Sequence, residues 1–366
     1  MLIKETLNKS LNTYYDINKF QSDFNTIYKI TDKKKIEQIQ LLKVNSIWSF
    51  ITNKFEFYQD YKNKYRLPDT IKSLKDLNKF PTISKLDIQQ NYEKIFKDTF
   101  SNKYTLTGGS SGESTKFPTG YLNSKNNFNI TYFLRNIHSI DFNDPTCYIW
   151  GHSHKFGKGI LQKNTKKIIK SLKNFFLNRK QFSAYDLSEK NLYLITKFIL
   201  LKKPKIIFGY GSSLSTLFRY MYEQNKEPFN NNIKIINTSE NLDKEILPTI
   251  KKLYPNSTLV NEFGMAESGV IGYNEINDFY KIKIFWPGFI TQSIDNKLIL
   301  TTLLVSNFPL FRYLPDDYVN IKNEDNLLNF EIKGKERPIF NFIGKGNTKK
   351  ISLILLDHVL KYEKFI

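Results

Sequence analysis

The sequence predicts an α/β protein built around a parallel sheet, with antiparallel strands toward its C-terminus. Between residues 205 and 263, short apolar runs alternate with amphipathic runs in the order strand, helix, strand, helix, strand. Such alternation implies right-handed crossovers between neighbouring parallel strands. From about residue 280, short alternating segments are separated by turn residues, which is typical of antiparallel strands.

The region before the glycine-rich loop carries helix signals. Apolar side chains recur near helical spacing and predict a helix over residues 33–60: Ile36, Ile39, Leu42, Ile47 and Ile51. Pro81 then breaks the chain. Ser84, with Asp87 three residues later, forms a capping box that starts the next helix.

The remaining elements follow from the same periodicities. We expect helices at 123–140, 165–178, 187–201, 212–224 and 242–254. We expect buried strands at 146–150, 205–210, 233–237 and 257–263. The alternating segments after them predict a small antiparallel β subdomain beside the parallel sheet.

The charge of the chain is strongly positive. Its 366 residues include 55 basic and 35 acidic side chains, for a net charge of +20. A basic protein attracts nucleic acid, anionic membranes, nucleotides or acidic proteins. The lysines are scattered among Asn and Ile along the whole chain, which compositional drift in an AT-rich genome also produces, so both explanations stay open. Because no zinc finger or other recognition module is evident, we do not expect a nucleic-acid partner.

Cysteine use and hydropathy bear on the location of the protein. The single cysteine, Cys147, excludes an intramolecular disulfide and a Cys-rich zinc site. No run of about 18 apolar residues is present, so we expect no transmembrane segment. The N-terminal residues also lack the apolar stretch of a secretory signal. Together these features favour the cytoplasm.

The stretch YTLTGGSSGESTKFPTG, residues 104–120, is the first candidate site. A glycine-rich loop can turn its backbone N–H groups inward and bind an anion. Lys116 adds a positive charge, and hydroxyl donors come from Ser110, Ser111, Ser114 and Thr115. The spacing departs from the Walker pattern G-x-x-x-x-G-K-[ST]. Taken alone, a phosphate-binding loop and a plain surface turn both stay open.

Five segments, in order, resemble motifs of the acyl-adenylate-forming superfamily. The loop resembles T-[SG]-G-[ST]-[ST]-G, which in that superfamily holds the β- and γ-phosphates of ATP. The other segments are KFPTISKLDIQQN (79–91), INTSENL (236–242), NEFGMAES (261–268) and PLFRYLPDDYV (309–319). The resemblance covers about residues 50–366, and the branch it resembles is that of phenylacetate–CoA ligases and related capsular polysaccharide biosynthesis proteins.

The resemblance implies a large adenylate-forming N-terminal domain followed by a small mobile lid. The helical part of the large domain would span 1–95 and its nucleotide- and acyl-binding core 96–333. The hinge and the start of a truncated lid would span 334–366. The implied activity is ATP-dependent, AMP-forming activation of a carboxylic acid, with ATP and Mg²⁺, and with CoA or a carrier-protein thiol as acceptor. The implied setting is capsular or surface polysaccharide synthesis, cytoplasmic or peripheral to the inner membrane.

The resemblance also assigns roles to residues. Glu267 would bind Mg²⁺ and, with Lys116, serve catalysis. The nucleotide would be bound by Thr107, Gly109, Ser110, Ser111, Gly112, Ser239, Glu240, Phe263, Gly264, Ala266, Asp317 and Lys335. The acyl pocket would be lined by His154, Tyr210 and Gly211. Two alternatives stay open: a helix N-cap also explains TSENLD, and His152 with His154 forms an H-x-H pair, although no third metal ligand is evident.

The sequence departs from the superfamily pattern in several places. Ala266 stands where the superfamily has Thr or Ser, Asp316 replaces the glycine before Asp317, and Pro338 lies at or beside the usual hinge aspartate. Arg312 keeps the family spacing, and we expect it to pair with a carboxylate. The lid lysine is expected to be missing, because only the first segment of a lid is present.

These departures keep a second hypothesis open. The chain would then be a non-catalytic nucleotide-binding or scaffolding descendant of the superfamily, which needs a separate lid polypeptide. The partners implied by the resemblance are the carboxylic acid substrate, an acidic carrier protein and a second copy of the chain in a homodimer.

Overall fold

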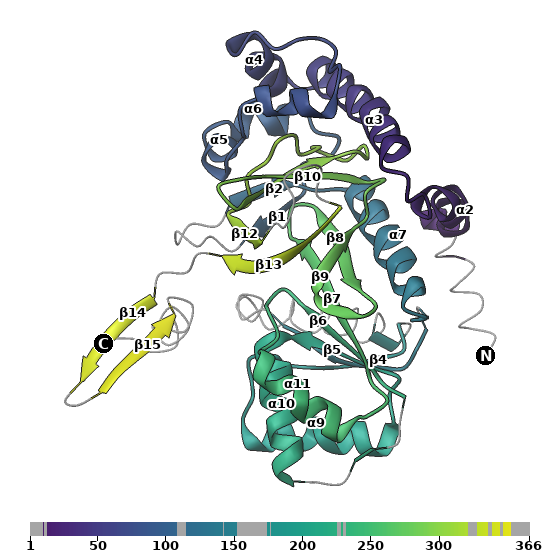
Figure 1. Ribbon diagram of the computed structural model, residues 1–366, viewed down its shortest axis with the longest axis vertical. Coiled ribbons are helices and arrows are strands. Elements are labelled where there is room, and N and C mark those ends of the chain that lie inside the picture. Colours follow the sequence, from purple (N-terminus) through teal and green to yellow (C-terminus); the bar gives the residue numbers. More distant parts are fainter. Residues whose placement is uncertain are drawn as a thin grey trace, which may run out of the picture.

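The structure is a computed structural model (Figure 1). It describes residues 10, 13–107, 115–141, 143–151, 174–175, 177–224, 228–229, 232–320, 328–335, 339–344 and 347–352, with side chains as far as residue 333. N-terminal helices lie at one end of a long mixed sheet, and further helices lie at the other end (Figure 1).

The N-terminal helices are α2 (Ile17–Tyr28), α3 (Lys33–Lys54), α4 (Glu56–Lys64), η1 (Leu74–Lys79), α5 (Lys85–Gln90) and α6 (Tyr92–Lys97). The single helix predicted over 33–60 is two helices. Phe55 has extended backbone, with φ −111° and ψ 119°, and separates α3 from α4. The first amide of α4, Glu56 N, donates to Asp98 Oδ2 at 2.8 Å. This partner, distant in the sequence, satisfies an amide that the break leaves without a helical acceptor.

The predicted capping box at the start of α5 is confirmed. Ser84 N donates to Asp87 Oδ2 at 2.7 Å. In return, Asp87 N donates to Ser84 Oγ at 3.2 Å. The reciprocal bonds satisfy two amides that a helix start leaves without partners.

Eleven strands of the described chain form one mixed sheet. Its parallel half contains, in spatial order, β4 (Arg179–Phe182), β3 (Thr146–Ile149), β5 (Ile206–Tyr210), β6 (Lys234–Thr238) and β7 (Thr258–Met265). Its antiparallel half continues with β8 (Gly269–Glu275), β9 (Asp278–Ile284), β13 (Asn329–Lys335), β12 (Asp317–Asn320), β11 (Lys297–Thr302) and β10 (Phe289–Ile294). The predicted fold class is confirmed, and the β7–β8 hairpin joins the two halves.

Two antiparallel strand pairs stand outside this sheet. They are β1 (Tyr104–Thr107) with β2 (Thr115–Pro118), and β14 (Ile339–Gly344) with β15 (Asn347–Ser352). The first pair encloses the glycine-rich loop. The loop therefore connects two strands of a hairpin.

Helices cover one face of the parallel half. This face carries α9 (Glu189–Lys202), α10 (Gly211–Gln224), η3 (Lys244–Ile246) and α11 (Leu247–Leu253) (Figure 1). Helix α7 (Tyr121–Ile137) packs against β8. The helix predicted at 165–178 lies largely outside the described residues. No helix in the described part of the chain is long and apolar enough to cross a membrane.

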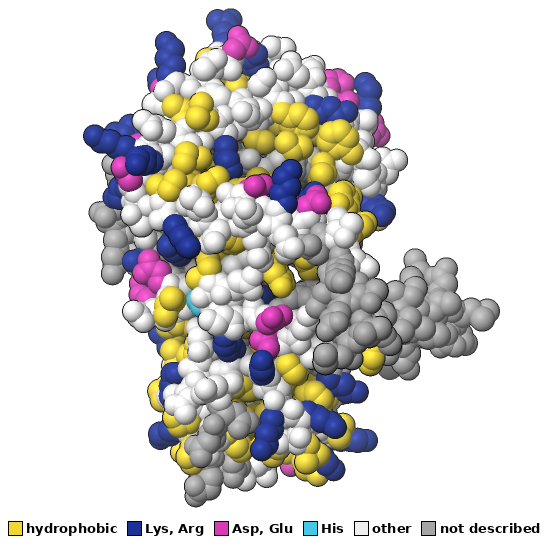
Figure 2. Space-filling view, turned by 90° about the vertical axis from the view of Figure 1, so that its right-hand side faces the viewer, with side chains coloured by type: hydrophobic (Ala, Val, Ile, Leu, Met, Phe, Trp, Pro, Cys, Tyr) yellow, Lys and Arg dark blue, Asp and Glu magenta, His cyan; other side chains and the backbone are white. Residues whose placement is uncertain are grey.

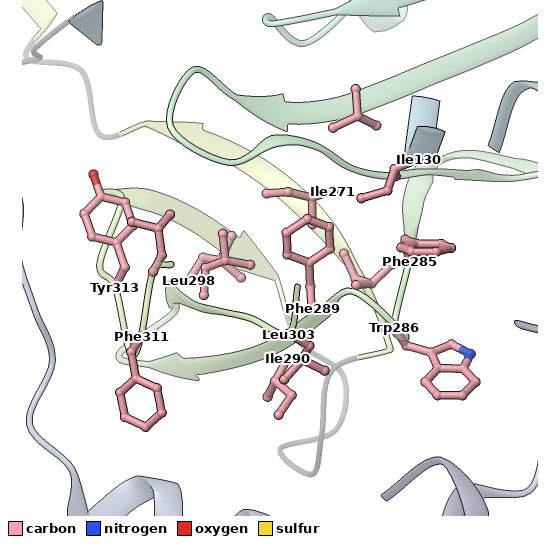
Figure 3. Close-up of a cluster of buried hydrophobic side chains, with 14 of the residues drawn as sticks. Ile130, Ile271, Phe285, Trp286, Phe289, Ile290, Leu298, Leu303, Phe311 and Tyr313 are labelled. Atoms are coloured by element: carbon pink, nitrogen blue, oxygen red, sulfur yellow. The ribbon is translucent and has the colours of Figure 1, made fainter. Parts of the chain in front are cut away.

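The N-terminal helices and the antiparallel strands share one hydrophobic core (Figure 3). Trp48 of α3 is fully buried. Its ring stacks on Phe311, with 4.7 Å between ring centroids. Its indole N–H donates to Pro68 O at 2.9 Å. The helices are therefore part of the platform on which the candidate site is built.

Lys43 gives the fold a pH-dependent contribution to stability. Burial lowers the pKa of Lys43 from its ordinary 10.5 to about 8, although Lys43 Nζ donates to Pro287 O at 2.7 Å. Below pH 8 the lysine is charged in both folded and unfolded chains, so the folded protein bears the full cost of burial. Between the two pKa values the folded chain holds fewer protons, so its free energy of unfolding should rise with pH.

The Lys43→Met variant should lack this dependence. We expect the wild type to gain about 1–2 kcal/mol relative to the variant between pH 7.5 and 9.5, discounted because the side chain is only partly buried. Urea unfolding at the two pH values measures it. Equal pH dependence of the two proteins would refute the role of Lys43.

Candidate functional site

Tyr313 lies where four of the five motif segments meet. Its hydroxyl donates to Glu267 Oε1 at 2.9 Å. Its backbone forms a bridge to Ile83, and its ring packs edge-on against Phe117 at 5.5 Å. Figure 3 shows the hydroxyl pointing away from the hydrophobic cluster. The buried tyrosine thus joins its own segment, PLFRYLPDDYV, to KFPTISKLDIQQN, to the glycine-rich hairpin and to NEFGMAES.

The fifth segment, INTSENL, is attached through the parallel pairing of β6 and β7. Asn237 Nδ2 donates to Asn261 Oδ1 at 2.9 Å, and Thr238 Oγ1 donates to Glu262 Oε1 at 3.4 Å. Segments spread over more than half of the sequence therefore form one connected region.

The base of the glycine-rich loop is well defined. Thr107 and Thr115 are register partners at the loop end of the hairpin, and both are buried. Gln89 Nε2 donates to Thr115 Oγ1 at 2.9 Å. The Thr107 hydroxyl finds no hydrogen-bond partner within the described part of the chain. The loop residues themselves lie outside the described residues, including the predicted Gly109, Ser110, Ser111 and Gly112.

Lys116 faces solvent on the hairpin. Its ammonium lies 5.4 Å from the centre of the Tyr104 ring. Its neighbours Thr115 and Phe117 are buried, as the alternation of a strand requires. The charge of Lys116 is thus held at the surface, in β2 directly after the loop.

Glu267 sits in the turn between β7 and β8, next to the exposed Ala266. Asn127 of α7 fixes this turn by accepting a hydrogen bond from Val270 N at 2.8 Å. Gly269 has φ +76°, and a Cβ there would lie 2.5 Å from Asn127 Oδ1. A glycine is therefore required for α7 to approach the turn that carries Glu267.

Beside Glu267 lies a small hollow, which the sequence analysis missed. Its lining is mixed, and its polar members include Asn123, Asn126, Ser268, Thr302 and Ser306. No group of three or more His, Cys, Asp or Glu side chains suited to a metal ion occurs among the described residues.

Ser239 and Glu240 lie over the N-terminus of α10. Glu240 Oε2 accepts a hydrogen bond from Ser212 N at 3.1 Å, and Ser239 has φ +66°. A Cβ on Gly211 would lie 2.5 Å from Asn241 O. Two residues of the segment TSENLD therefore cap helices: Glu240 caps α10 and Asp243 caps η3.

An aromatic wall lies on β3 and β5, with Trp150 directly after β3, beside the predicted acyl pocket. Trp150 packs on Tyr210 at 4.4 Å between ring centroids, and Tyr148 stacks on Phe208 at 4.8 Å. The Tyr210 hydroxyl donates to Gly151 O at 3.3 Å. His154, predicted for the same pocket, lies outside the described residues, as does His152.

Phe263 and Gly264 lie in β7, where its pairing with β8 is irregular. Phe263 is buried and packs edge-on against Phe330 at 5.7 Å. A Cβ on Gly264 would lie 2.7 Å from Gly269 O. The glycine is thus already required by the close approach of the two strands, whatever its role toward a nucleotide.

Asp317 and Lys335 are opposite each other in the pairing of β12 with β13. Asp317 is buried, and the Lys335 side chain is outside the described part. Asp316, which stands in place of glycine, adopts φ +64°, the left-handed backbone that glycine favours. Lys85 Nζ lies 3.3 Å from its carboxylate. Asp316 can occupy this position because aspartate tolerates the left-handed conformation.

Contrary to expectation, Arg312 pairs with no carboxylate of the described residues. Its buried guanidinium donates to Phe80 O at 3.1 Å and to Gln292 Oε1 at 2.7 Å. Because both acceptors are neutral, Arg312 joins the N-terminal helices to the strand β10 and serves the architecture of the site.

A largely buried ionic cluster, in which Arg135 keeps 26% side-chain exposure, was also missed by the sequence analysis. Arg135 Nη2 lies 3.0 Å from Glu262 Oε2, and the Tyr273 hydroxyl donates to the same carboxylate. Burial and then Glu262 raise the pKa of Tyr273 well above its usual value. Burial works against the Arg135 charge, but Tyr273 and Glu262 outweigh it and raise the pKa of Arg135.

We compared the sequence and the fold with those of known proteins. No protein-family model matches the chain. It is 23% identical to Protein CapK from Staphylococcus aureus over 328 residues, which are 88% of this chain and 71% of that protein. Among solved structures it is similar to 2-hydroxyisobutyryl-CoA ligase in complex with 2-HIB-AMP and CoA, with TM-score 0.64 and 15% identity over 91% of this chain and 74% of that chain.

A second solved structure agrees. The acyl acid amido synthetase AtGH3.15 in complex with 2,4-DB matches with TM-score 0.55 and 12% identity, over 86% of this chain and 70% of that chain. One of the two is a CoA ligase and the other an acyl acid amido synthetase. The chain therefore shares the fold of these two proteins, which is the fold that its five ordered motifs predicted.

Proposed function

We propose that the protein activates a carboxylic acid by forming an acyl adenylate from ATP. A carboxylate oxygen of the acid would form a bond to the α-phosphorus, the bond from that phosphorus to the β-bridging oxygen would break, and pyrophosphate would leave. The observation that carries the proposal is the meeting of the motif segments around Tyr313 and Glu267.

The residues divide the work of this reaction. The glycine-rich loop and Thr107 would bind the phosphates, and Asp317 would accept hydrogen bonds from the ribose hydroxyls, since a carboxylate is an acceptor only. Glu267 would hold Mg²⁺, which neutralises charge on the phosphates when bound. The aromatic wall of β3 and β5 would flank the acid.

The acceptor and the setting are further parts of the proposal. CoA or a carrier-protein thiol would take the acyl group, and the likeness to Protein CapK supports a role in capsular or surface polysaccharide synthesis. The solved 2-hydroxyisobutyryl-CoA ligase, which contains an acyl adenylate and CoA, supports this pair of ligands.

The test is acid-dependent ATP–pyrophosphate exchange across a panel of aryl, fatty and amino acids, with Mg²⁺ present. Exchange with at least one acid is expected. Calorimetry with ATP and Mg²⁺ accompanies it. The proposal fails if no acid in the panel supports exchange, whether or not the nucleotide binds.

The second candidate is a nucleotide-binding protein without turnover. Ala266 favours it, because it leaves the turn beside Glu267 without the hydroxyl that the motif usually supplies, and loss of one donor at such a site costs about 10²–10³ in rate. ATP binding with no exchange for any acid would support this candidate over the enzyme.

Tyr313 is predicted to position Glu267. Burial, and then the Glu267 carboxylate, raise the pKa of Tyr313, so the hydroxyl stays protonated as a donor. In Tyr313→Phe, we expect half-maximal exchange to need about tenfold more Mg²⁺, because a hydrogen bond to a charged group is lost. Titration of the exchange rate with Mg²⁺ measures this.

Tyr58→Phe is the matched control. Tyr58 is also buried, and its hydroxyl donates to Pro309 O at 2.6 Å, which is a neutral acceptor. It should lower stability without changing the Mg²⁺ dependence. The same Mg²⁺ dependence in both variants would contradict the positioning role.

A further inference from the structure

Helix α9 presents an unusually apolar outer face. Its inward side chains Leu192, Ile195 and Ile199 are buried on the sheet. On the other face, large apolar side chains stay exposed, with relative exposures of 53% for Tyr193, 47% for Leu194, 41% for Leu200 and 68% for Leu201. Folding does not require apolar residues there, because the helix already buries its opposite side.

Lysines alternate with these apolar side chains. Residues 190–203 contain four lysines: Lys190, Lys197, Lys202 and Lys203. The one acidic residue of α9 is Glu189, at its start. All four lysines are exposed. Positions 190, 194, 197 and 201 follow at intervals of three or four residues, so apolar and basic groups share one face of the helix. Figure 2 shows yellow and dark blue side chains next to one another over the lower end of the molecule, where α9 lies in Figure 1.

We propose that the outer face of α9 docks the protein on an anionic lipid bilayer. A helix that carries Lys on a face with Leu and Tyr can lie in the plane of the membrane interface. Lysine stems cover apolar surface while their ammonium groups reach the lipid phosphates. Tyrosine is favoured at the same depth.

Charge complementarity selects this occupant. The four lysines of residues 190–203 are attracted to an anionic leaflet, and this attraction falls off within a Debye length. Lys197 Nζ already lies 5.8 Å from the centre of the Tyr193 ring, so the basic and aromatic groups form one surface. Docking leaves the fold intact, since the buried side of α9 keeps its contacts with the sheet.

Co-sedimentation of the full chain with vesicles tests the proposal. We expect binding to phosphatidylcholine vesicles that contain phosphatidylglycerol, weaker binding as NaCl is raised, and little binding to phosphatidylcholine alone. The double variant Leu194→Ser/Leu201→Ser should bind at least about tenfold more weakly, because two leucines no longer enter the interface. Its ATP binding and its thermal midpoint should match the wild type.

Leu42→Ser is the matched control, because Leu42 of α3 is 72% exposed and lies outside this surface. It should bind vesicles as the wild type does. The proposal is overturned by absence of binding to the anionic vesicles, by equal binding to the neutral ones, or by an equal loss in Leu42→Ser. It is also overturned if sedimentation velocity shows a wild-type dimer that the double variant dissociates, since α9 would then be an interface between copies.

Discussion

Glu267→Gln should lower acid-dependent ATP–pyrophosphate exchange by about 10²-fold or more. The glutamine keeps the shape of the side chain and can still accept the hydrogen bond that the Tyr313 hydroxyl donates at 2.9 Å. It removes the negative charge that would hold Mg²⁺, and the described residues supply no cluster of carboxylates to replace it. Initial exchange rates at saturating acid, measured over a range of Mg²⁺ concentrations, give the effect.

Glu275→Gln is the control for this experiment. Glu275 is the last residue of β8. Its carboxylate lies 3.0 Å from Lys281 Nζ in an ion pair, and its side chain is 34% exposed. Its replacement should leave exchange unchanged. If Glu267→Gln kept most of the wild-type rate, or if both variants lost the same share, Glu267 would not be the residue that holds the metal.

Arg135→Met should destabilise the protein by about 3–5 kcal/mol. The Glu262 carboxylate, with 9% side-chain exposure, would lose its only ion-pair partner among the described residues and keep a buried charge. The Arg135 guanidinium also lies 5.3 Å from the centre of the Phe208 ring, and that contact would be lost as well. Urea unfolding at neutral pH measures the change in the free energy of unfolding.

Two further variants show whether burial is the cause. Arg219→Met removes an exposed arginine, 54% accessible, whose ion pair with Asp243 spans 2.8 Å, and should cost less than about 1 kcal/mol. Arg135→Met/Glu262→Leu should regain part of the loss, because no unpaired charge remains. A loss below 1 kcal/mol in Arg135→Met would show that the cluster does not carry this stability.

Local signals predicted local structure well. The capping box of Ser84 and Asp87 formed as expected, because both partners lie within one helical turn. The alternation of strands and helices over residues 205–263 predicted β5, α10, β6, α11 and β7. This worked because the spacing of apolar residues indicates which face of each element is buried. The break at Phe55 was missed, since its position depends on Asp98, far along the chain.

In the candidate site, too, motif order was predicted correctly and contacts between distant residues were not. The five motifs in order predicted the fold that the solved structures bear out. The partner of Arg312 was predicted wrongly, because a guanidinium accepts any well-placed oxygen and the sequence does not say which oxygens are near. The Arg135 cluster and the polar side chains beside Glu267 were missed, since single polar residues on α7 carry no periodic signal.

By itself, the sequence determined the α/β class, the order of the elements and the identity of the candidate side chains, because these depend on neighbours within a few residues and on motif order. Only the tertiary structure decided that Tyr313 touches Glu267, that Asp316 adopts the backbone of a glycine, and that lysines and leucines stay exposed together on the outer face of α9. The physical reason is that contacts across the sheet depend on pairing and packing between segments distant in the chain, which no local pattern encodes.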